Sequence, residues 1–145
     1  MSATVHASAV LAGARAVLIR GASGTGKSRL ARALIEASRA GLLPFARLVG
    51  DDRVHLQAAA GRLLVQPAPA LAGLIEVRGI GIARMPHEPE AVVGLVVDLG
   101  ASAERLPEPE QRWTEIEGIR LPRLAVAAGN DALPMILAAL TSPPE

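Results

Sequence analysis

The chain has 145 residues, of which half are hydrophobic, a formal net charge of +1 and no cysteine. This length predicts one domain with a substantial apolar core, and the missing cysteine excludes disulfides and thiolate metal sites. The small net charge, without a basic run, argues against nucleic acid or a membrane surface as a partner. A membrane helix needs about 20 consecutive apolar residues, and no apolar run in the sequence is that long. Residues 1–10 lack the pattern of a signal peptide, so we expect a cytoplasmic protein.

Residues 4–20 have the pattern of a β-hairpin. Apolar side chains alternate loosely along residues 5–11, residues 12–14 supply a turn, and residues 15–20 return as an apolar, β-branched strand. His6 is therefore expected on a strand beside that second strand. A lone histidine in a strand is usually a surface or packing residue, but histidine also titrates near neutral pH and can act in catalysis. Both interpretations of His6 stay open on spacing alone.

The segment after this hairpin fits the phosphate-binding pattern G-x-x-x-x-G-K-[ST]. A helical pattern follows over residues 29–40, and Gly41 marks its end. Glycines let backbone N–H groups point at phosphate oxygens, and a helix N-terminus adds positive partial charge. The order strand, glycine-rich loop and helix predicts a nucleoside triphosphate site; a glycine-rich turn with a chance lysine is the alternative. The loop residues are Gly21, Ala22, Ser23, Gly24, Thr25, Gly26, Lys27 and Ser28, of which Lys27 would reach the β- and γ-phosphates and Ser28 would bind Mg²⁺.

Two adjacent carboxylates follow the next predicted strand. Residues 45–49 form an apolar strand that leads into Gly50 and then Asp51 and Asp52. In phosphoryl transfer, one carboxylate can order Mg²⁺ or its water while another accepts the proton of the attacking hydroxyl. A polar turn that ends the strand is the alternative, but the phosphate-binding loop upstream favours the catalytic interpretation. Asp98, near the end of a predicted buried strand over residues 91–99, is a rival metal ligand.

Residues 71–82 contain an apparent strand on which Glu76 and Arg78 share one face. An ordinary surface ion pair would explain these two residues without any function. Gly79 and Gly81 indicate a tight turn or a backbone that needs close approach.

The rest of the chain predicts further strands and a last helix. Residues 54–57 and 63–66 form a second hairpin, and one or two short strands lie within residues 116–126. Asn130 or Asp131 can cap a helix whose body covers residues 135–140. The fold class is therefore α/β.

Together these motifs resemble the catalytic domain of HPr kinase/phosphorylase, which phosphorylates a serine of the bacterial phosphocarrier protein HPr. The resemblance covers residues 4–100 and, more weakly, 113–140. It rests on residues 5–7, the loop at 21–28, residues 49–54 and, most distinctively, residues 75–82. It implies a single domain over residues 1–145, with its core at about 4–140, built on a mixed sheet related to that of phosphoenolpyruvate carboxykinase. It also implies a tendency to form hexamers, and ATP and Mg²⁺ as cofactors.

The resemblance also implies roles for individual residues. Asp51 would be the general base toward the serine hydroxyl, and Asp52 would support the metal and charge arrangement beside it. Ser28 and Glu76 would help to hold Mg²⁺. His6 would lie near the phosphates and act in catalysis together with Lys27.

The distinctive segment contributes Arg78, Gly79 and Gly81, of which Arg78 is expected to order the site or the partner surface. Asp98 has no role in the family, which weakens its claim as a metal ligand.

This sequence also departs from the family pattern. Nothing before residue 4 corresponds to the N-terminal domain of longer members, so we expect the short form of some proteobacteria. Arg29 stands where an acidic residue is common, and residues 126–131 lack two arginines that the family ties to the phosphorylase reaction. We therefore expect kinase activity with weak or no phosphorylase activity. A nucleotide-binding regulatory module and a P-loop kinase of another acceptor stay open as alternatives.

Overall fold

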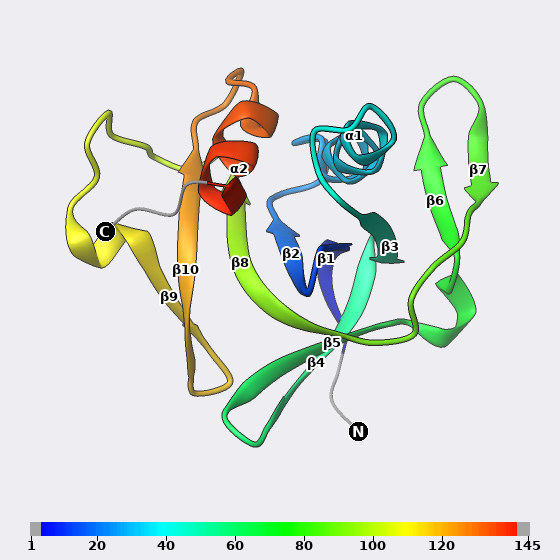
Figure 1. The fold of residues 1–145 in the computed structure, drawn as a ribbon, viewed down its shortest axis with the longest axis horizontal. Coiled ribbons are helices and arrows are strands. Elements are labelled where there is room, and N and C mark those ends of the chain that lie inside the picture. The colour runs from blue at the N-terminus through cyan, green and yellow to red at the C-terminus, as the bar shows by residue number, and fades with distance from the viewer. Residues whose placement is uncertain (1–3, 142–145) are drawn as a thin grey trace.

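The computed structural model describes residues 4–141, in which eight strands form one mixed sheet and two form a separate hairpin (Figure 1). The predicted α/β architecture with a mixed sheet is confirmed, whereas its likeness to phosphoenolpyruvate carboxykinase stays a prediction. In chain order the elements are β1 (Thr4–Ala12), β2 (Arg15–Arg20), α1 (Lys27–Arg39), β3 (Ala46–Gly50), β4 (Arg53–Ala59), β5 (Arg62–Pro67), the 3₁₀ turn η1 (Pro69–Leu71), β6 (Leu74–Val77), β7 (Gly81–Arg84), β8 (Ala91–Leu99), the 3₁₀ turn η2 (Pro109–Arg112), β9 (Trp113–Ile116), β10 (Ile119–Val126) and α2 (Ala132–Thr141).

Five strands of the large sheet close into a ring. Their order is β2-β1-β4-β5-β8, and β8 pairs with β2 to complete the circuit. The start of β8 pairs antiparallel with β5, while the rest of this bent strand runs parallel to β2 and β10 (Figure 1). All five strands contribute to one buried cluster, which includes Leu18, Val54, Leu63 and Val93. Side chains fill the inside of such a small ring, so it is a packed core.

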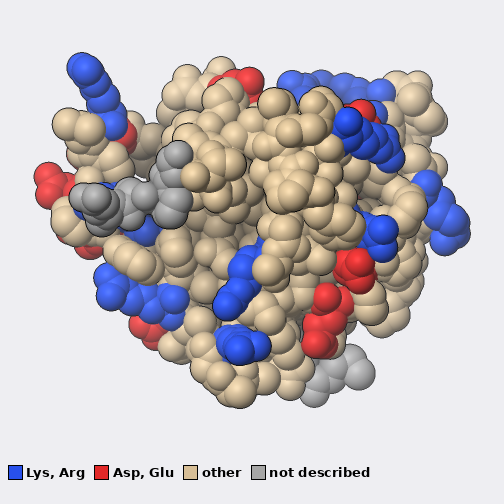
Figure 2. Space-filling model, in the orientation of Figure 1, with Lys and Arg blue, Asp and Glu red and all other residues tan. Residues whose placement is uncertain are grey.

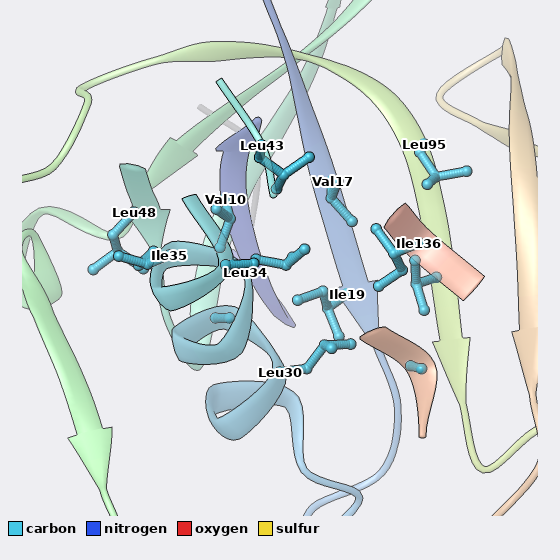
Figure 3. Packing of buried hydrophobic residues seen from close by; sticks show 14 of the residues in the cluster. Val10, Val17, Ile19, Leu30, Leu34, Ile35, Leu43, Leu48, Leu95 and Ile136 are labelled. Carbon is cyan, nitrogen blue, oxygen red and sulfur yellow. The ribbon is translucent and has the colours of Figure 1, made fainter. Parts of the chain in front are cut away.

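A second core lies outside the ring, where α1 and α2 cover β1, β2 and β8 (Figure 1). Leu30, Leu34 and Ile35 recur along one face of α1 and are buried. They pack against Val17 and Ile19 of β2 (Figure 3). Burying each of these leucines contributes roughly 1.5–3 kcal/mol. Because neighbouring residues of β2 serve both cores, this strand is an unbroken apolar run, and the phosphate-binding loop starts from a rigid base.

Both helix ends that the sequence predicts are confirmed. Gly41 follows α1 with a φ of 83°, a left-handed conformation that glycine adopts at low cost. At the start of α2, the Asp131 carboxylate accepts the backbone N–H of Leu133 at 3.1 Å. Pro134 falls in the first turn of α2, where its missing N–H has no helical partner to lose.

The segment over residues 71–82 differs from the single strand that the sequence predicts. Strand β6 ends at Val77, a turn follows, and β7 returns from Gly81 as its antiparallel partner. Arg78 therefore lies in the turn, and the prediction that it shares a strand face with Glu76 is wrong. The prediction of a tight turn at the glycines is confirmed, since Gly79 has a φ of 84°. The resulting β6–β7 hairpin stands apart from the large sheet (Figure 1).

Basic and acidic side chains lie interspersed on the face seen in Figure 2, without one continuous patch of either sign. This distribution matches the small net charge of the sequence. Within residues 4–141, neither helix combines the length and the apolar character that a membrane crossing requires.

Candidate active site

The glycine-rich loop over residues 21–26 joins the buried strand β2 to the N-terminus of α1. A Cβ at Gly21 would lie 2.5 Å from the Thr25 hydroxyl oxygen and 3.2 Å from Leu99, so a side chain there would force these neighbours to shift. Gly26 directly precedes the helix with a φ of 96° and a ψ of 25°, which strains any residue with a side chain. Two local constraints thus fix glycines at the beginning and the end of the loop.

The start of α1 is equipped to attract an anion. Its first turn contains no acidic residue, and no side chain caps it. The free N–H groups and the partial positive charge of the helix dipole therefore face the loop. The Lys27 ammonium donates to the carbonyl oxygens of Gly21 at 2.8 Å and Ala22 at 3.2 Å. It therefore lies across the loop, close to the place where the loop amides would surround phosphate oxygens.

Asp51 is the centre of a buried polar cluster beside this helix. It follows β3 and is only 4% exposed. The Ser28 hydroxyl lies 2.8 Å from both of its carboxylate oxygens, and the backbone N–H of Glu76 donates to Oδ2 at 3.2 Å. The Ser8 hydroxyl donates to Oδ1 at 2.6 Å. The structure thus brings Asp51 and Ser28 together, although they are far apart in the chain, and adds Ser8 and the start of the β6–β7 hairpin.

Asp52 and His6 lie at the exposed border of this cluster. Asp52 is exposed, and its φ of 69° is unusual for a residue other than glycine. His6 lies on β1, next to β2 as predicted, and its register partner on β4 is Arg53, the residue after Asp52. Both side chains are exposed, so a ligand or partner approaching the loop could reach them.

The remaining predicted residues are not drawn into the cluster. The Glu76 side chain is exposed, since the neighbouring Ile75 and Val77 point into the core. Arg78, Gly79 and Gly81 are exposed in the β6–β7 hairpin. Among the described residues, the backbone N–H of Glu76 makes the one hydrogen bond between this hairpin and Asp51.

The oxygen donors of this site suit a magnesium ion. Within residues 4–141, no three histidine, aspartate or glutamate side chains converge as a metal site. Mg²⁺ is usually bound by one or two protein oxygens together with substrate phosphates and water, so a complete protein cage is not required. The Ser28 hydroxyl at the loop, which lies 2.8 Å from the Asp51 carboxylate, provides a hard oxygen ligand of this kind. The residues present therefore fit Mg²⁺ together with a nucleotide.

The position of Asp98 suggested a rival metal ligand, but in the structure its carboxylate forms ion pairs with two arginines. Arg20 binds it through two hydrogen bonds, at 2.7 Å and 2.8 Å, and Arg123 donates to Oδ2 at 2.5 Å. Burial raises the pKa of the Asp98 carboxyl, but the hydrogen bonds and charges of the two arginines outweigh this effect and hold the pKa below its ordinary value. Asp98 thus joins β2, β8 and β10, and it fixes Arg20 directly before the loop.

We expect Asp98→Asn to lower the free energy of unfolding by about 1–3 kcal/mol at neutral pH, because two partly buried arginines lose their counter-charge. The folded-state pKa is lowered, so this contribution is complete above the unfolded-state value of about 3.9 and is lost as the pH falls through the folded-state value. Urea unfolding of both proteins at neutral pH and near pH 3 would measure the difference, which should shrink in acid.

The matched control is Glu88→Gln. It breaks the more exposed pair with Arg47, at 3.2 Å, and should cost less than about 1 kcal/mol. An equal difference between wild type and Asp98→Asn at both pH values would contradict the proposed ion-pair contribution.

Ser8, which contacts Asp51, was not among the site residues predicted from the sequence. It lies fully buried in β1, where Ala7 and Ala9 beside it are buried as well. A hydroxyl between small residues in a strand gives only a weak signal, because serine also occurs in strands without a function. Its partner Asp51 is 43 residues away, so no local pattern links the two.

A cavity of about 540 Å³ lies elsewhere, between β8, β10, α2 and the segment before β9. Its lining is mainly apolar and includes Leu95, Trp113 and Leu124. Neither the loop residues nor Asp51 line it, so it is separate from the site described above.

Strand, glycine-rich loop and helix N-terminus, with a buried aspartate beside the loop serine, define the class: an α/β domain with a glycine-rich loop between a buried strand and a helix. The chain belongs to the family described as the HPr Serine kinase C-terminal domain, whose model matches residues 1–141. The resemblance seen in the sequence is thereby confirmed.

Individual relatives agree with this assignment. HPr kinase/phosphorylase of Mycoplasma mycoides subsp. mycoides SC is 32% identical over 142 residues, which cover 86% of this chain and 42% of that protein. HPr kinase/phosphorylase of Caldicellulosiruptor bescii is 32% identical over 136 residues, which cover 85% of this chain and 41% of that protein. The chain thus spans about two-fifths of the length of these relatives.

A solved structure has the same fold. The Hpr(Ser) kinase/phosphatase from Coxiella burnetii superposes with a TM-score of 0.76 at 26% sequence identity, covering 96% of this chain and 88% of that chain. The likeness extends over most of both chains.

Proposed function

We propose that this chain transfers the γ-phosphoryl group of ATP to a serine of an HPr-type phosphocarrier protein. It would thereby regulate carbon and nitrogen metabolism through the phosphotransferase system. One observation carries the proposal: the loop serine Ser28 lies 2.8 Å from both carboxylate oxygens of the buried Asp51, at a helix N-terminus that carries Lys27. This arrangement, in a member of the HPr kinase family, supports phosphoryl transfer to a protein serine.

The loop would bind the nucleotide phosphates. Backbone N–H groups of residues 21–28 would donate to the phosphate oxygens, and the dipole of α1 would favour their negative charge. The Lys27 ammonium, which donates to two loop carbonyls, would turn to the β- and γ-phosphates. Most of the rate enhancement would come from positioning and charge neutralisation.

Mg²⁺ would be held by Ser28, with Asp52 and Glu76 contributing oxygen ligands or binding its waters. When bound, it would neutralise charge on the β- and γ-phosphate oxygens. Asp51 fixes the orientation of the Ser28 hydroxyl, which lies 2.8 Å from its carboxylate.

Asp51 is the proposed general base. The oxygen of the acceptor serine forms a bond to the γ-phosphorus, the bond from that phosphorus to the β-phosphate oxygen breaks, and ADP leaves. The serine proton passes to the Asp51 carboxylate. His6 would lie beside the transferred group, while Arg78, Gly79 and Gly81 of the β6–β7 hairpin would border the acceptor protein.

The proposal extends to the reverse reaction and to the setting of the enzyme. Residues 126–131 lack the two arginines that the family pattern places there, so phosphorylase activity should be weak or absent. Assembly into a homo-oligomer, in the cytoplasm, is part of the same proposal.

Arg29 and the missing arginines also favour a second candidate, a nucleotide-binding regulatory module that has lost transfer. Arg29 is an exposed cation in the first turn of α1, at a place where the family pattern is commonly acidic. A P-loop kinase with another acceptor would share all the geometry described above.

The decisive test incubates the chain with Mg²⁺, γ-labelled ATP and a purified HPr-type protein. Label is expected on one serine of the acceptor and should be absent from an acceptor whose target serine is alanine. Added inorganic phosphate should release little of this label. Bound ATP without any label on the acceptor would overturn the kinase proposal and favour the regulatory module or another acceptor.

A further inference from the structure

The Ser8 hydroxyl touches both catalytic aspartates at once. It donates to the Asp51 carboxylate at 2.6 Å and lies 3.5 Å from the backbone nitrogen of Asp52, whose N–H it accepts. The neighbouring Ala7 donates its N–H to the Asp52 carbonyl at 3.2 Å. Two consecutive residues of β1 therefore hold the aspartate pair, one through a side chain and one through the backbone.

The turn that they hold is strained. The N–H of Arg53 donates to the Asp51 carbonyl at 2.8 Å, which closes a three-residue γ-turn around Asp52. Asp52 has a φ of 69°, and a γ-turn of this hand is rare for a residue with a side chain. Such strain persists only where the surrounding structure imposes it, and it is found mainly at functional sites.

The strand before the turn is also irregular. Ala9 of β1 pairs with Gly50 of β3, but the next residue, Val10, pairs with Leu48, so β3 has one extra residue at this point. A bulge of this kind redirects the residues that follow it, and bulges are frequent beside active sites. Here it lies directly before Asp51 and opposite Ala9, the residue after Ser8 in β1.

We propose that Ser8 is a positioning residue for the phosphoryl transfer. Its hydroxyl fixes the rotation of the Asp51 carboxylate, so that this carboxylate meets Ser28 at the loop, and it anchors the strained turn that presents Asp52. Ser8 is fully buried and Asp51 is 4% exposed, so no water can replace this hydrogen bond without rearrangement of the core. The inference rests on the proposed function for its effect on transfer.

The test compares Ser8→Ala, Ser8→Cys and Ser8→Thr with wild type. Ser8→Ala removes the hydroxyl, Ser8→Cys keeps the shape with a weak donor, and Ser8→Thr keeps the hydroxyl at the expense of an added methyl group. Ser38→Ala is the matched control, because Ser38 is half-buried on α1 and makes no side-chain hydrogen bond within residues 4–141. Ser8→Ala and Ser8→Cys should lower kcat about 10- to 10²-fold, while KM for the acceptor changes little because Ser8 is out of its reach.

A second measurement needs no acceptor protein. Calorimetric titration with ATP, with and without Mg²⁺, should show that Ser8→Ala loses part of the affinity gained from Mg²⁺, whereas affinity without Mg²⁺ stays at the wild-type value. This result would support the role of Ser8 even if the acceptor proved to be a different protein. Thermal unfolding of each variant checks that the measured protein is folded. If Ser8→Ala does not fold, Ser8→Cys is compared with wild type in its place.

Two results would overturn the proposal. One is a wild-type kcat and a wild-type gain from Mg²⁺ in folded Ser8→Ala or Ser8→Cys. The other is a Ser8→Thr variant that unfolds at the wild-type temperature and is nevertheless as slow as Ser8→Ala, because the hydroxyl alone would then not restore transfer.

Discussion

Asp51→Asn is expected to lower the rate of phosphoryl transfer by about 10²- to 10⁴-fold, the range that a general base contributes. Asparagine has nearly the same shape, but its amide cannot take up the serine proton. Its NH₂ group would also face the Ser28 hydroxyl or the Glu76 N–H, which both lie against the carboxylate now, at 2.8 Å and 3.2 Å. Single-turnover transfer from γ-labelled ATP to the acceptor measures the chemical step without product release.

Asp52→Asn is the matched control for this variant. Asp52 precedes Arg53 at the exposed border of the site, and the change keeps the residue's tolerance for a positive φ. A smaller loss than for Asp51→Asn is expected, together with a higher Mg²⁺ requirement. If Asp52→Asn proves the slower enzyme while Asp51→Asn still transfers, the role of the base passes to Asp52.

Lys27→Ala is expected to lower the transfer rate by about 10²- to 10³-fold, the loss typical when one donor to a developing charge is removed. It should also weaken ATP binding, because the ammonium is the positively charged side chain that crosses the loop. Lys27 is half-buried and its present partners are the carbonyls of Gly21 and Ala22. The variant should therefore fold, which thermal unfolding can verify.

Lys27→Arg separates charge from geometry in the same assay. A guanidinium keeps the charge but is broader than an ammonium and presents its donors in a planar fork, so we expect partial recovery of ATP binding and poor transfer. Wild-type transfer by Lys27→Ala would rule out a role of this lysine in the reaction.

Local patterns were sufficient wherever the cause of a structure lies within a few consecutive residues. The glycine-rich loop between β2 and α1 follows from glycine conformations and a helix start within residues 21–28, and the end of α1 follows from Gly41; that this loop binds phosphate stays a prediction. The hairpin over residues 4–20 and the strand at residues 91–99 follow from alternation and from a continuous apolar run. In each case neighbouring side chains carry the information.

Structure that depends on distant partners could not be predicted from these patterns. The role of Asp98 required Arg20, 78 residues away, to occupy its carboxylate. Ser8 and Asp51 meet only because β1 and β3 pair with a bulge. The strand at residues 71–82 was predicted too long for a local reason: Arg78 and Ile80 have no strand-breaking chemistry of their own, and the bend comes from the adjacent glycines, whose tight turn was predicted.

The ring of five strands has a consequence for the order in which the chain can fold. The loop at residues 21–28 is synthesised before β8, the strand that closes the ring against β2 and comes about 70 residues later in the chain. Pairings between distant segments form slowly, because the loop between them must first be closed. On the ribosome, the glycine-rich loop would therefore emerge on an unfinished sheet and become rigid only after residues 91–99 have left the exit tunnel.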